Sequence, residues 1–282
     1  MPKVTKKTLN LRGNVLDLTF PVVMGILNIN PDSFYAGSRF PSVDQAVERA
    51  RTLLAEGATF LDIGGYSTRP GAADVSPEEE ADRVLPVFEG ILKAFPGVWL
   101  SVDTFRASVA RQAVEAGAVM VNDVSGGRLD PAMFETVVLL GVPYVLMHLR
   151  GTPQTMTQYS TYTHLVPDVL FELQQQVQQL RALGQTDLVI DPGFGFAKTP
   201  EQNFQLLNQL AAFQTFDAPV LVGLSRKSTI WRTLNIRPEE ALNGTTVLNT
   251  LAILNGADIL RVHDVREATE VIKLVTSCQQ TL

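Results

Sequence analysis

The chain has 282 residues and carries 23 Lys plus Arg against 29 Asp plus Glu, a formal charge of −6. Nucleic-acid-binding proteins usually present a basic face, and no cluster of Lys and Arg follows Lys7, so we expect no nucleic-acid partner. Apolar residues make up 45% of the chain and charged residues 18%, a composition that supplies a large core and excludes a disordered chain.

Eight short apolar runs recur along the chain, and each ends in polar residues. They lack strict apolar–polar alternation, which is typical of parallel strands covered on both faces. Each interval between runs has room for one helix and two loops. The runs span residues 22–28, 59–64, 99–103, 119–123, 144–148, 188–191, 220–225 and 259–263.

The segments between the runs carry helix signals. Residues 42–45, 76–79 and 199–202 fit capping boxes, and Asp264 offers a weaker cap for the last helix. The glutamine-rich stretch 174–179 lies on the polar side of a predicted helix, so we expect it to face solvent.

Eight alternating strand and helix units predict an α/β protein, a (β/α)8 TIM barrel that forms a single domain over residues 1–282. Residues 1–20 are predicted to be an N-terminal extension, with a hairpin around residues 12–14 that closes the bottom of the barrel. The alternative fold is an open doubly wound sheet. It is less favoured because no G-x-G-x-x-G follows the first run.

The sequence predicts a cytoplasmic protein with no membrane partner. The only cysteine is Cys278, which excludes a disulfide framework or a Cys-rich zinc site. The longest apolar stretch, residues 137–149, is too short for a membrane span. The basic N-terminus has no apolar signal core behind it.

Polar residues are concentrated where the runs end, and in a barrel the carboxyl ends of all eight strands meet at one mouth. A single aspartate there is equally well explained as a cap for the next helix. Convergence of many such groups favours a ligand site. The residues are Asn28, Asp62, Asp103, Asn122, Asp123, His148, Asp191, Lys227, Arg261 and His263.

These residue types indicate a ligand with two different ends. Buried carboxylates beside an amide suit a flat heterocycle with an amidine-like edge that donates paired hydrogen bonds, and Lys227 could bind a ring carbonyl or nitrogen. Arg69, Arg261 and His263 suit an anionic tail such as diphosphate. The loops at 28–34 and 64–71 are candidate lids, and the helix start at 225–228 is a candidate anion site.

Eight stretches together resemble the dihydropteroate synthase family, in family order and over residues 24–264. They are MGILNINPDSF, DIGGYSTRPGA, SVDT, VNDVSGG, LMHLRGTPQTM, DPGFGFAK, GLSRKS and RVHD. The resemblance implies a transferase of folate biosynthesis that joins 6-hydroxymethyl-7,8-dihydropterin diphosphate to 4-aminobenzoate, giving dihydropteroate and diphosphate. It also implies Mg²⁺ as cofactor, a sulfonamide target and a homodimer with Ile272 and Val275 as plausible contacts.

The resemblance also implies roles for individual residues. Those that would act in catalysis are Asp103, Lys227, Asp32 and Arg69. The pterin would bind Asp103, Asn122, Asp191, Lys227, Met147, Phe196 and Arg261. The diphosphate would bind Asn28, Thr68, Arg261 and His263, with Asn28 also holding the metal. The 4-aminobenzoate would bind Thr68, Pro70, Lys227 and Ser228.

Three positions depart from the family pattern. Tyr66 stands where an acidic residue is common, Ala197 replaces a glycine, and Arg150 stands where an uncharged residue is more familiar. They leave open how the loops close and how the site responds to inhibitors. They bear less on the reaction type.

Three other functions remain open on sequence alone. A pterin-binding methyltransferase would share the ring contacts but needs no residues that bind diphosphate or benzoate. An aldolase would form a Schiff base on Lys227, and a pterin- or phosphate-binding protein would not catalyse a reaction.

Overall fold

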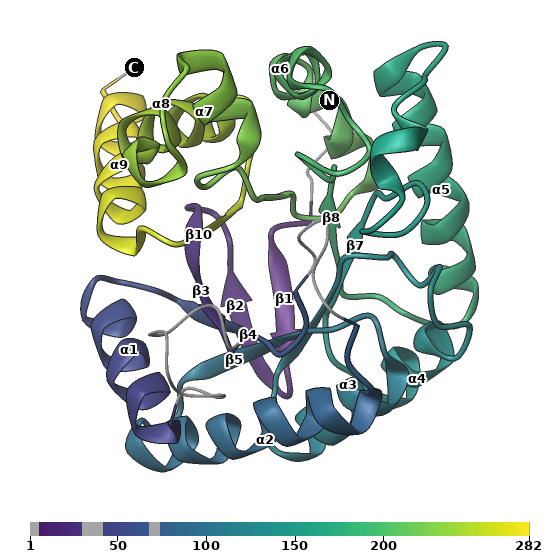
Figure 1. The fold of residues 1–282 in the computed structure, drawn as a ribbon, viewed down its shortest axis with the longest axis vertical. Helices are drawn as coiled ribbons and strands as arrows, with labels where there is room; N and C mark the ends of the chain where they lie inside the picture. Colours follow the sequence, from purple (N-terminus) through teal and green to yellow (C-terminus); the bar gives the residue numbers. More distant parts are fainter. Residues whose placement is uncertain (1–5, 30–41, 68–73, 282) are drawn as a thin grey trace.

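The computed structural model describes residues 6–29, 42–67 and 74–281, and its centre is an eight-stranded parallel sheet (Figure 1). The strand order is β8-β7-β6-β5-β4-β3-β10-β9, and a parallel bridge between Ile190 and Val220 joins the two edges. The predicted (β/α)8 barrel is thereby confirmed. Its strands are β3 (Val22–Asn28), β4 (Phe60–Gly64), β5 (Trp99–Asp103), β6 (Met120–Asp123), β7 (Tyr144–Met147), β8 (Leu188–Asp191), β9 (Leu221–Val222) and β10 (Ile259–Val262).

Nine α-helices among the described residues surround these strands as an outer layer (Figure 1). Three short 3₁₀ helices, at Met156–Tyr159, Leu210–Phe216 and Pro238–Glu240, lie in the connections. The α-helices are α1 (Val43–Ala55), α2 (Pro77–Ala94), α3 (Ala107–Glu115), α4 (Met133–Leu140), α5 (Leu165–Ala182), α6 (Pro200–Asn208), α7 (Ser228–Leu234), α8 (Leu242–Leu254) and α9 (Val265–Gln279).

Local sequence signals set several helix boundaries. Ser42 and Thr199 form reciprocal capping boxes at the starts of α1 and α6. At α2, Ser76 accepts a hydrogen bond from the backbone of Glu79, and Pro77 follows as the first helical residue. Asp264 occupies the expected N-cap position of α9, but its side chain makes no capping hydrogen bond because its carboxylate pairs with Arg226 at 2.8 Å.

A hairpin packs against one end of the barrel. It consists of β1 (Thr8–Leu11) and β2 (Asn14–Asp17), paired antiparallel. Leu9, Leu11, Leu16 and Leu18 share one apolar cluster with the inward side chains from the amino-terminal halves of the strands. These inward residues are Met24, Phe60, Met120, Val145, Val189, Leu221 and Ile259.

Strand side chains alternate between the two faces of a sheet, so the residue two positions after each of these also faces the lumen. In four of these strands that residue is polar: Asp62, Asn122, Asp191 and Arg261. The barrel therefore changes from apolar to charged along its own axis, and the charged layer lies toward the carboxyl ends of the strands.

The prediction for the glutamine-rich stretch was wrong at one residue. Gln176 is buried on α5 and donates a hydrogen bond to the carbonyl of Gly126. A helical face that is polar in composition can lie beneath a neighbouring loop, where an amide finds a backbone partner.

Candidate active site

The charged layer is organised around the guanidinium of Arg261, on β10. Its Nε donates to Asp62 on β4 at 2.6 Å, and its Nη2 donates to Asp103 on β5 at 2.6 Å. The amide of Asn122, on β6, donates to the same Asp62 oxygen at 2.8 Å. Four strands thus contribute to one connected network, and the structure brings together Asp103, Asn122 and Arg261 as the sequence predicted.

Asp62 was expected among the strand-end residues of the site, but the family resemblance gave it no role of its own. It is fully buried, and its second oxygen, Oδ1, has no hydrogen-bond partner among the described residues. A buried acceptor without a donor is costly, so the site favours a ligand that donates. The signal available in the sequence was its position two residues after the inward-facing Phe60, which places it in the lumen.

Burial controls the protonation of the site. Burial raises the pKa of Asp103 to about 7; the positive charge of Arg261 opposes this shift, and the like charge of Asp62 adds to it. Burial also raises the pKa of Asp191 against the opposing charge of Lys227. It lowers the pKa of Lys227 to about 8, although Asp191 opposes that shift.

Asp191 and Lys227 are held by the loop that follows β8. The backbone N–H of Gly193 donates to Asp191 Oδ1 at 2.7 Å, and Lys227 Nζ donates to the carbonyl of Phe194. Gly195 has a φ of +76°, and a Cβ there would lie 2.9 Å from Lys227 Cδ. The glycine therefore lets the lysine stem pass close to the backbone.

An apolar wall borders the charged layer. Met147 and Ala197 lie in one cluster, against which Phe196 packs. Lys227 Nζ lies 4.6 Å from the centroid of the Phe196 ring. A flat ring placed here would meet carboxylates at its edge and apolar side chains on a face, which matches the heterocycle expected from the sequence.

The remaining predicted residues lie at the strand ends. Asn28 ends β3 and is half-buried. The His263 ring lies 3.2 Å from Ser225 Oγ. Ser228 begins α7, with Lys227 preceding it as the cap. Asp32, Thr68, Arg69 and Pro70 lie outside the described residues.

Two residues from the strand-end set face away from the lumen. Asp123 accepts hydrogen bonds from the hydroxyl of Tyr144 at 2.6 Å and from the backbone of Ser125 and Gly127. His148 contacts Glu172 on α5. Both follow an inward-facing residue by one position, so the alternation of the strand turns them toward the helices.

The described residues alone do not form a metal-binding cluster. No group of three His, Cys, Asp or Glu that could hold an ion occurs among residues 6–29, 42–67 and 74–281. Asn28 offers one amide oxygen at the mouth, a donor that Mg²⁺ accepts. The donor set fits an ion that arrives with oxygen ligands of its own, as a diphosphate would supply.

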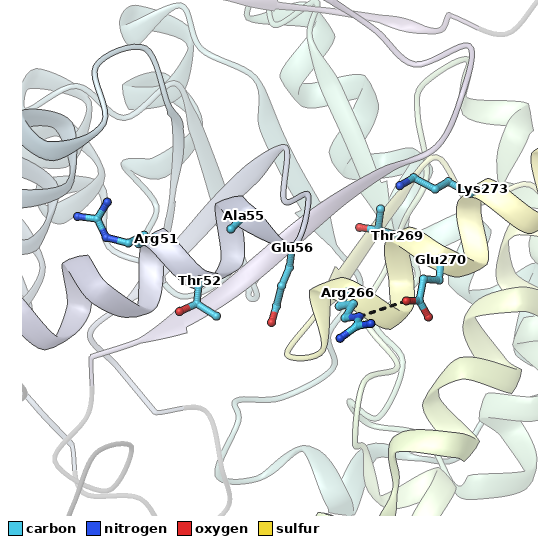
Figure 2. Close-up of a pocket in the computed structure, with 8 residues that line it drawn as sticks. All are labelled: Arg51, Thr52, Ala55, Glu56, Arg266, Thr269, Glu270 and Lys273. Carbon is cyan, nitrogen blue, oxygen red and sulfur yellow. Dashed lines mark hydrogen bonds and ion pairs between the residues drawn. The ribbon is translucent and has the colours of Figure 1, made fainter.

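A separate hollow of about 630 Å³ lies on the outside of the barrel, between α1 and α9 (Figure 2). Its charges are mixed, and two of them, Arg266 and Glu270, pair at 3.2 Å. No lumen residue lines it, so it is distinct from the site at the barrel mouth. Its lining residues are Arg51, Thr52, Ala55, Glu56, Arg266, Thr269, Glu270 and Lys273.

Within the ranges described, no helix has the length and apolarity that a membrane crossing requires.

Comparison with known proteins gives one consistent family. Residues 24–263 match the model of the pterin binding enzyme family. The chain is 43% identical over 266 residues to the dihydropteroate synthase of Escherichia coli K12, which covers 94% of each chain. Dihydropteroate synthase from Yersinia pestis, solved with a sulfonamide drug, superposes with a TM-score of 0.91 at 42% identity, covering 97% of this chain and 99% of that one.

A further solved relative was determined with a small aromatic acid. Dihydropteroate synthase from Xanthomonas albilineans with 4-aminobenzoic acid has a TM-score of 0.90 at 41% identity, and covers 98% of this chain and 99% of that one. The resemblance seen in the sequence motifs is therefore confirmed over nearly the whole chain.

The raised pKa of Asp103 gives a test of the site's electrostatics. A carboxyl with a pKa of about 7 in the folded state and about 3.8 when unfolded stabilises the fold below pH 4, and this contribution is lost as pH rises through 7. We expect Asp103→Asn, which cannot titrate, to gain Tm relative to wild type by roughly 3 °C between pH 5 and pH 8.

Thermal unfolding followed by circular dichroism across this pH range measures the difference. Asp82→Asn, at an exposed position on α2, is the control and should show no such trend. A Tm difference for Asp103→Asn that stays constant with pH would contradict the raised pKa.

Proposed function

The chain belongs to the pterin binding enzyme family, and we propose that it catalyses the dihydropteroate synthase reaction. In this reaction a transferase joins 6-hydroxymethyl-7,8-dihydropterin diphosphate to 4-aminobenzoate and releases diphosphate. The observation that carries the proposal is the network in which Arg261 joins Asp62 and Asp103 while Asn122 binds Asp62. Its carboxylates suit the donor edge of a pterin.

The lumen residues would bind the pterin ring. Asp103, Asn122 and Asp191 would face the ring edge, and Lys227 lies beside Phe196, where it could reach a ring carbonyl or nitrogen. The ion pairs with Asp62 and Asp103 fix the plane of the Arg261 guanidinium, which can then stack on the ring. Met147 and Phe196 would supply the apolar walls.

Departure of diphosphate leaves positive character on the pterin methylene and negative charge on the leaving group. Arg261 and His263 would stabilise the leaving group, and ionised Asp103 would stabilise the developing cation through the ring. Mg²⁺ held by the diphosphate and Asn28 would neutralise part of the same charge. No side-chain nucleophile is required, because the amine of 4-aminobenzoate attacks the methylene directly.

The 4-aminobenzoate would bind at the start of α7. We assign Lys227 and Ser228 to its pocket, together with Thr68 and Pro70 from the second loop. Asp32 and Arg69 would act in closing the site. These assignments rest on the family motifs, because those four loop residues lie outside the described part of the chain.

The proposed reaction predicts a product of defined mass. Purified protein with both substrates and Mg²⁺ should give 7,8-dihydropteroate by mass spectrometry. Asp103→Asn should lower turnover by about 100-fold or more, because a neutral amide cannot stabilise the cation, while the circular dichroism spectrum is retained. Near-normal turnover in this variant would remove Asp103 from the mechanism.

The same assay separates the alternative functions. Methyl transfer from methyltetrahydrofolate would favour the methyltransferase. A borohydride-trapped adduct on Lys227 would favour the aldolase, and ligand binding without turnover would favour a binding protein.

Metal removal should weaken binding of the pterin that carries a diphosphate but not binding of a pterin without one. Chelation by EDTA should weaken binding of the dihydropterin diphosphate by at least about tenfold, because the metal is held through the diphosphate oxygens. Binding of 6-hydroxymethylpterin should change less than about twofold, measured by isothermal titration calorimetry. An equal loss for both ligands would count against a metal carried by the diphosphate.

We further propose that the protein forms a homodimer through α7, α8 and α9. Exposed apolar side chains are Leu234 on α7, Leu274 on α9 and a stripe on α8 formed by Val247, Leu251 and Leu254. A second copy of the chain would cover this surface. Of the contacts expected from the sequence, Val275 is buried and Ile272 is half-buried, and both pack against the core, so we place the proposed interface on the exposed side chains.

Sedimentation velocity tests the dimer. Leu251→Glu should shift the protein toward a monomer by placing a charge within the apolar stripe. Leu139→Glu, at an exposed leucine on α4, is the matched control and should leave the sedimentation coefficient unchanged. A wild-type monomer at micromolar concentration would overturn this proposal.

A cytoplasmic location completes the proposal. It is in keeping with the single cysteine, Cys278, which is exposed and free.

A further inference from the structure

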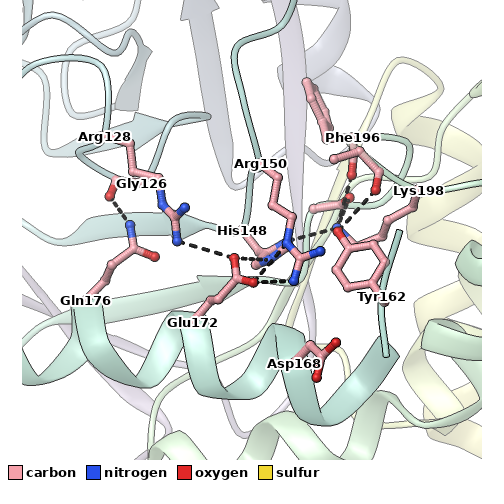
Figure 3. Close-up of polar contacts among 12 residues, drawn as sticks. Gly126, Arg128, His148, Arg150, Tyr162, Asp168, Glu172, Gln176, Phe196 and Lys198 are labelled. Atoms are coloured by element: carbon pink, nitrogen blue, oxygen red, sulfur yellow. Dashed lines mark hydrogen bonds and ion pairs between the residues drawn. The ribbon is translucent and has the colours of Figure 1, made fainter. Parts of the chain in front are cut away.

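A polar network outside the lumen begins at Glu172, on α5 (Figure 3). Its Oε1 accepts from Arg150 Nε at 2.8 Å, and its Oε2 lies 3.2 Å from His148 Nε2. Arg128 reaches the same carboxylate at 3.4 Å. The hydrogen bonds from His148 and Arg150 lower the pKa of Glu172 to about 2, although burial alone would raise it. Glu172 is therefore a fixed anion behind the barrel wall.

One arm of the network runs from Glu172 through His148 to Lys198. Lys198 Nζ lies 3.0 Å from His148 Nδ1 and donates to the carbonyls of Gly193 at 3.0 Å and Phe196 at 3.1 Å. An ammonium has three N–H donors, and these three acceptors use all of them. Lys198, which lies near the end of the loop that follows β8, thus binds two backbone carbonyls earlier in the same loop.

The second arm runs through an aromatic ring. The guanidinium of Arg150 lies 3.9 Å from the centroid of the Tyr162 ring. The Tyr162 hydroxyl donates to the carbonyl of Ala197 at 3.1 Å. Ala197 has a φ of +51°, a left-handed conformation that glycine adopts more easily. This arm therefore holds the loop where its backbone is strained.

The protonation states agree with this geometry. Burial and the charge of Lys198 lower the pKa of His148 to about 4, so its ring is neutral at pH 7. A neutral imidazole can donate through Nε2 to Glu172 while Nδ1 accepts from Lys198. When Lys198 is protonated, the ring therefore links a cation to an anion. Burial lowers the pKa of Lys198 to about 7, against the opposing charge of Asp191.

The loop held by both arms forms part of the proposed pterin site. It supplies the Phe196 ring, the carbonyl of Phe194 that accepts from Lys227, and the Gly193 N–H that donates to Asp191. A shift of this loop would move the apolar wall and two charged groups together. The hydrogen bonds of His148, Glu172, Arg150 and Tyr162 described above are made with one another and with the loop, and none of them involves a lumen residue.

We propose that Glu172, His148 and Lys198, with Arg150 and Tyr162 as a second arm, form a brace that positions residues 193–198 and so sets the affinity for the pterin ring. These are positioning residues for the proposed reaction, on which the inference rests. Two of the departures from the family pattern, Arg150 and Ala197, lie in the second arm. They are connected through Tyr162, whose ring contacts Arg150 and whose hydroxyl binds the carbonyl of Ala197.

The test compares pterin binding with the rest of the reaction. Lys198→Met retains the length of the side chain but loses its three donors. It should weaken binding of 6-hydroxymethyl-7,8-dihydropterin, measured by calorimetry, by about 10- to 100-fold. Both the KM for 4-aminobenzoate and kcat at saturating pterin should stay within about threefold of wild type.

Two further variants and a control keep the test decisive if Lys198→Met fails to fold. Glu172→Gln should weaken pterin binding by about 3- to 10-fold, and Tyr162→Phe by about threefold. Glu89→Gln, at an exposed position on α2, is the control and should bind as wild type. Glu172→Gln combined with Lys198→Met should bind no more weakly than Lys198→Met alone, because both act through one arm.

The outcomes separate the brace from the proposed function. Absence of pterin binding by the wild-type protein would overturn the proposed function itself. Wild-type binding with unchanged affinity in Glu172→Gln and Tyr162→Phe would overturn the brace alone. A fall in kcat with unchanged pterin affinity would also overturn it, since the brace acts on binding.

Discussion

The ion pairs of Arg261 with Asp62 and Asp103 are the constraint on which the barrel mouth depends. A guanidinium in the lumen is tolerated only with partners, and each carboxylate would be costly there without the cation. The two bonds of 2.6 Å join β10 to β4 and β5, which are strands far apart in sequence. This pairing therefore fixes the mouth and sets its charge at the same time.

Charge balance explains why such a mouth favours a ligand. Three carboxylates, on Asp62, Asp103 and Asp191, face two cations, on Arg261 and Lys227. Burial, with the like charge of Asp62, raises the pKa of Asp103, and the excess of acceptors leaves Asp62 Oδ1 without a donor among the described residues. A heterocycle that donates along its edge completes the set, whereas a well-packed apolar layer would stabilise the fold more. Binding, rather than stability, accounts for these residues.

The sequence predicted most strand ends to within one residue, because eight apolar runs of parallel strands are a strong pattern, but the seventh strand ends at Val222 rather than Ser225. It could not give the direction of each side chain, since a shift of one residue in a strand reverses the face. For that reason Asp123 and His148 were grouped with lumen residues although both point toward the helices. Asp62 was underestimated because an aspartate at a strand end is equally well explained as a helix cap. The loop roles of Asp32 and Arg69 came from family motifs and stay predictions.

The position of the wall beside the pterin site depends on contacts made outside the lumen. Gly193 must be a glycine because a Cβ there would lie 2.1 Å from the carbonyl oxygen of His148, so the loop after β8 lies directly against β7. Such close packing leaves the loop little freedom against β7. Lys198, which is itself part of the loop, donates back to the carbonyl of Gly193, and the Tyr162 hydroxyl donates to the carbonyl of Ala197. The lumen supplies the groups that contact a ligand, whereas α5 and β7 determine where one wall of the lumen stands. A change at Glu172, which lies behind this wall, can therefore alter recognition without touching the ligand.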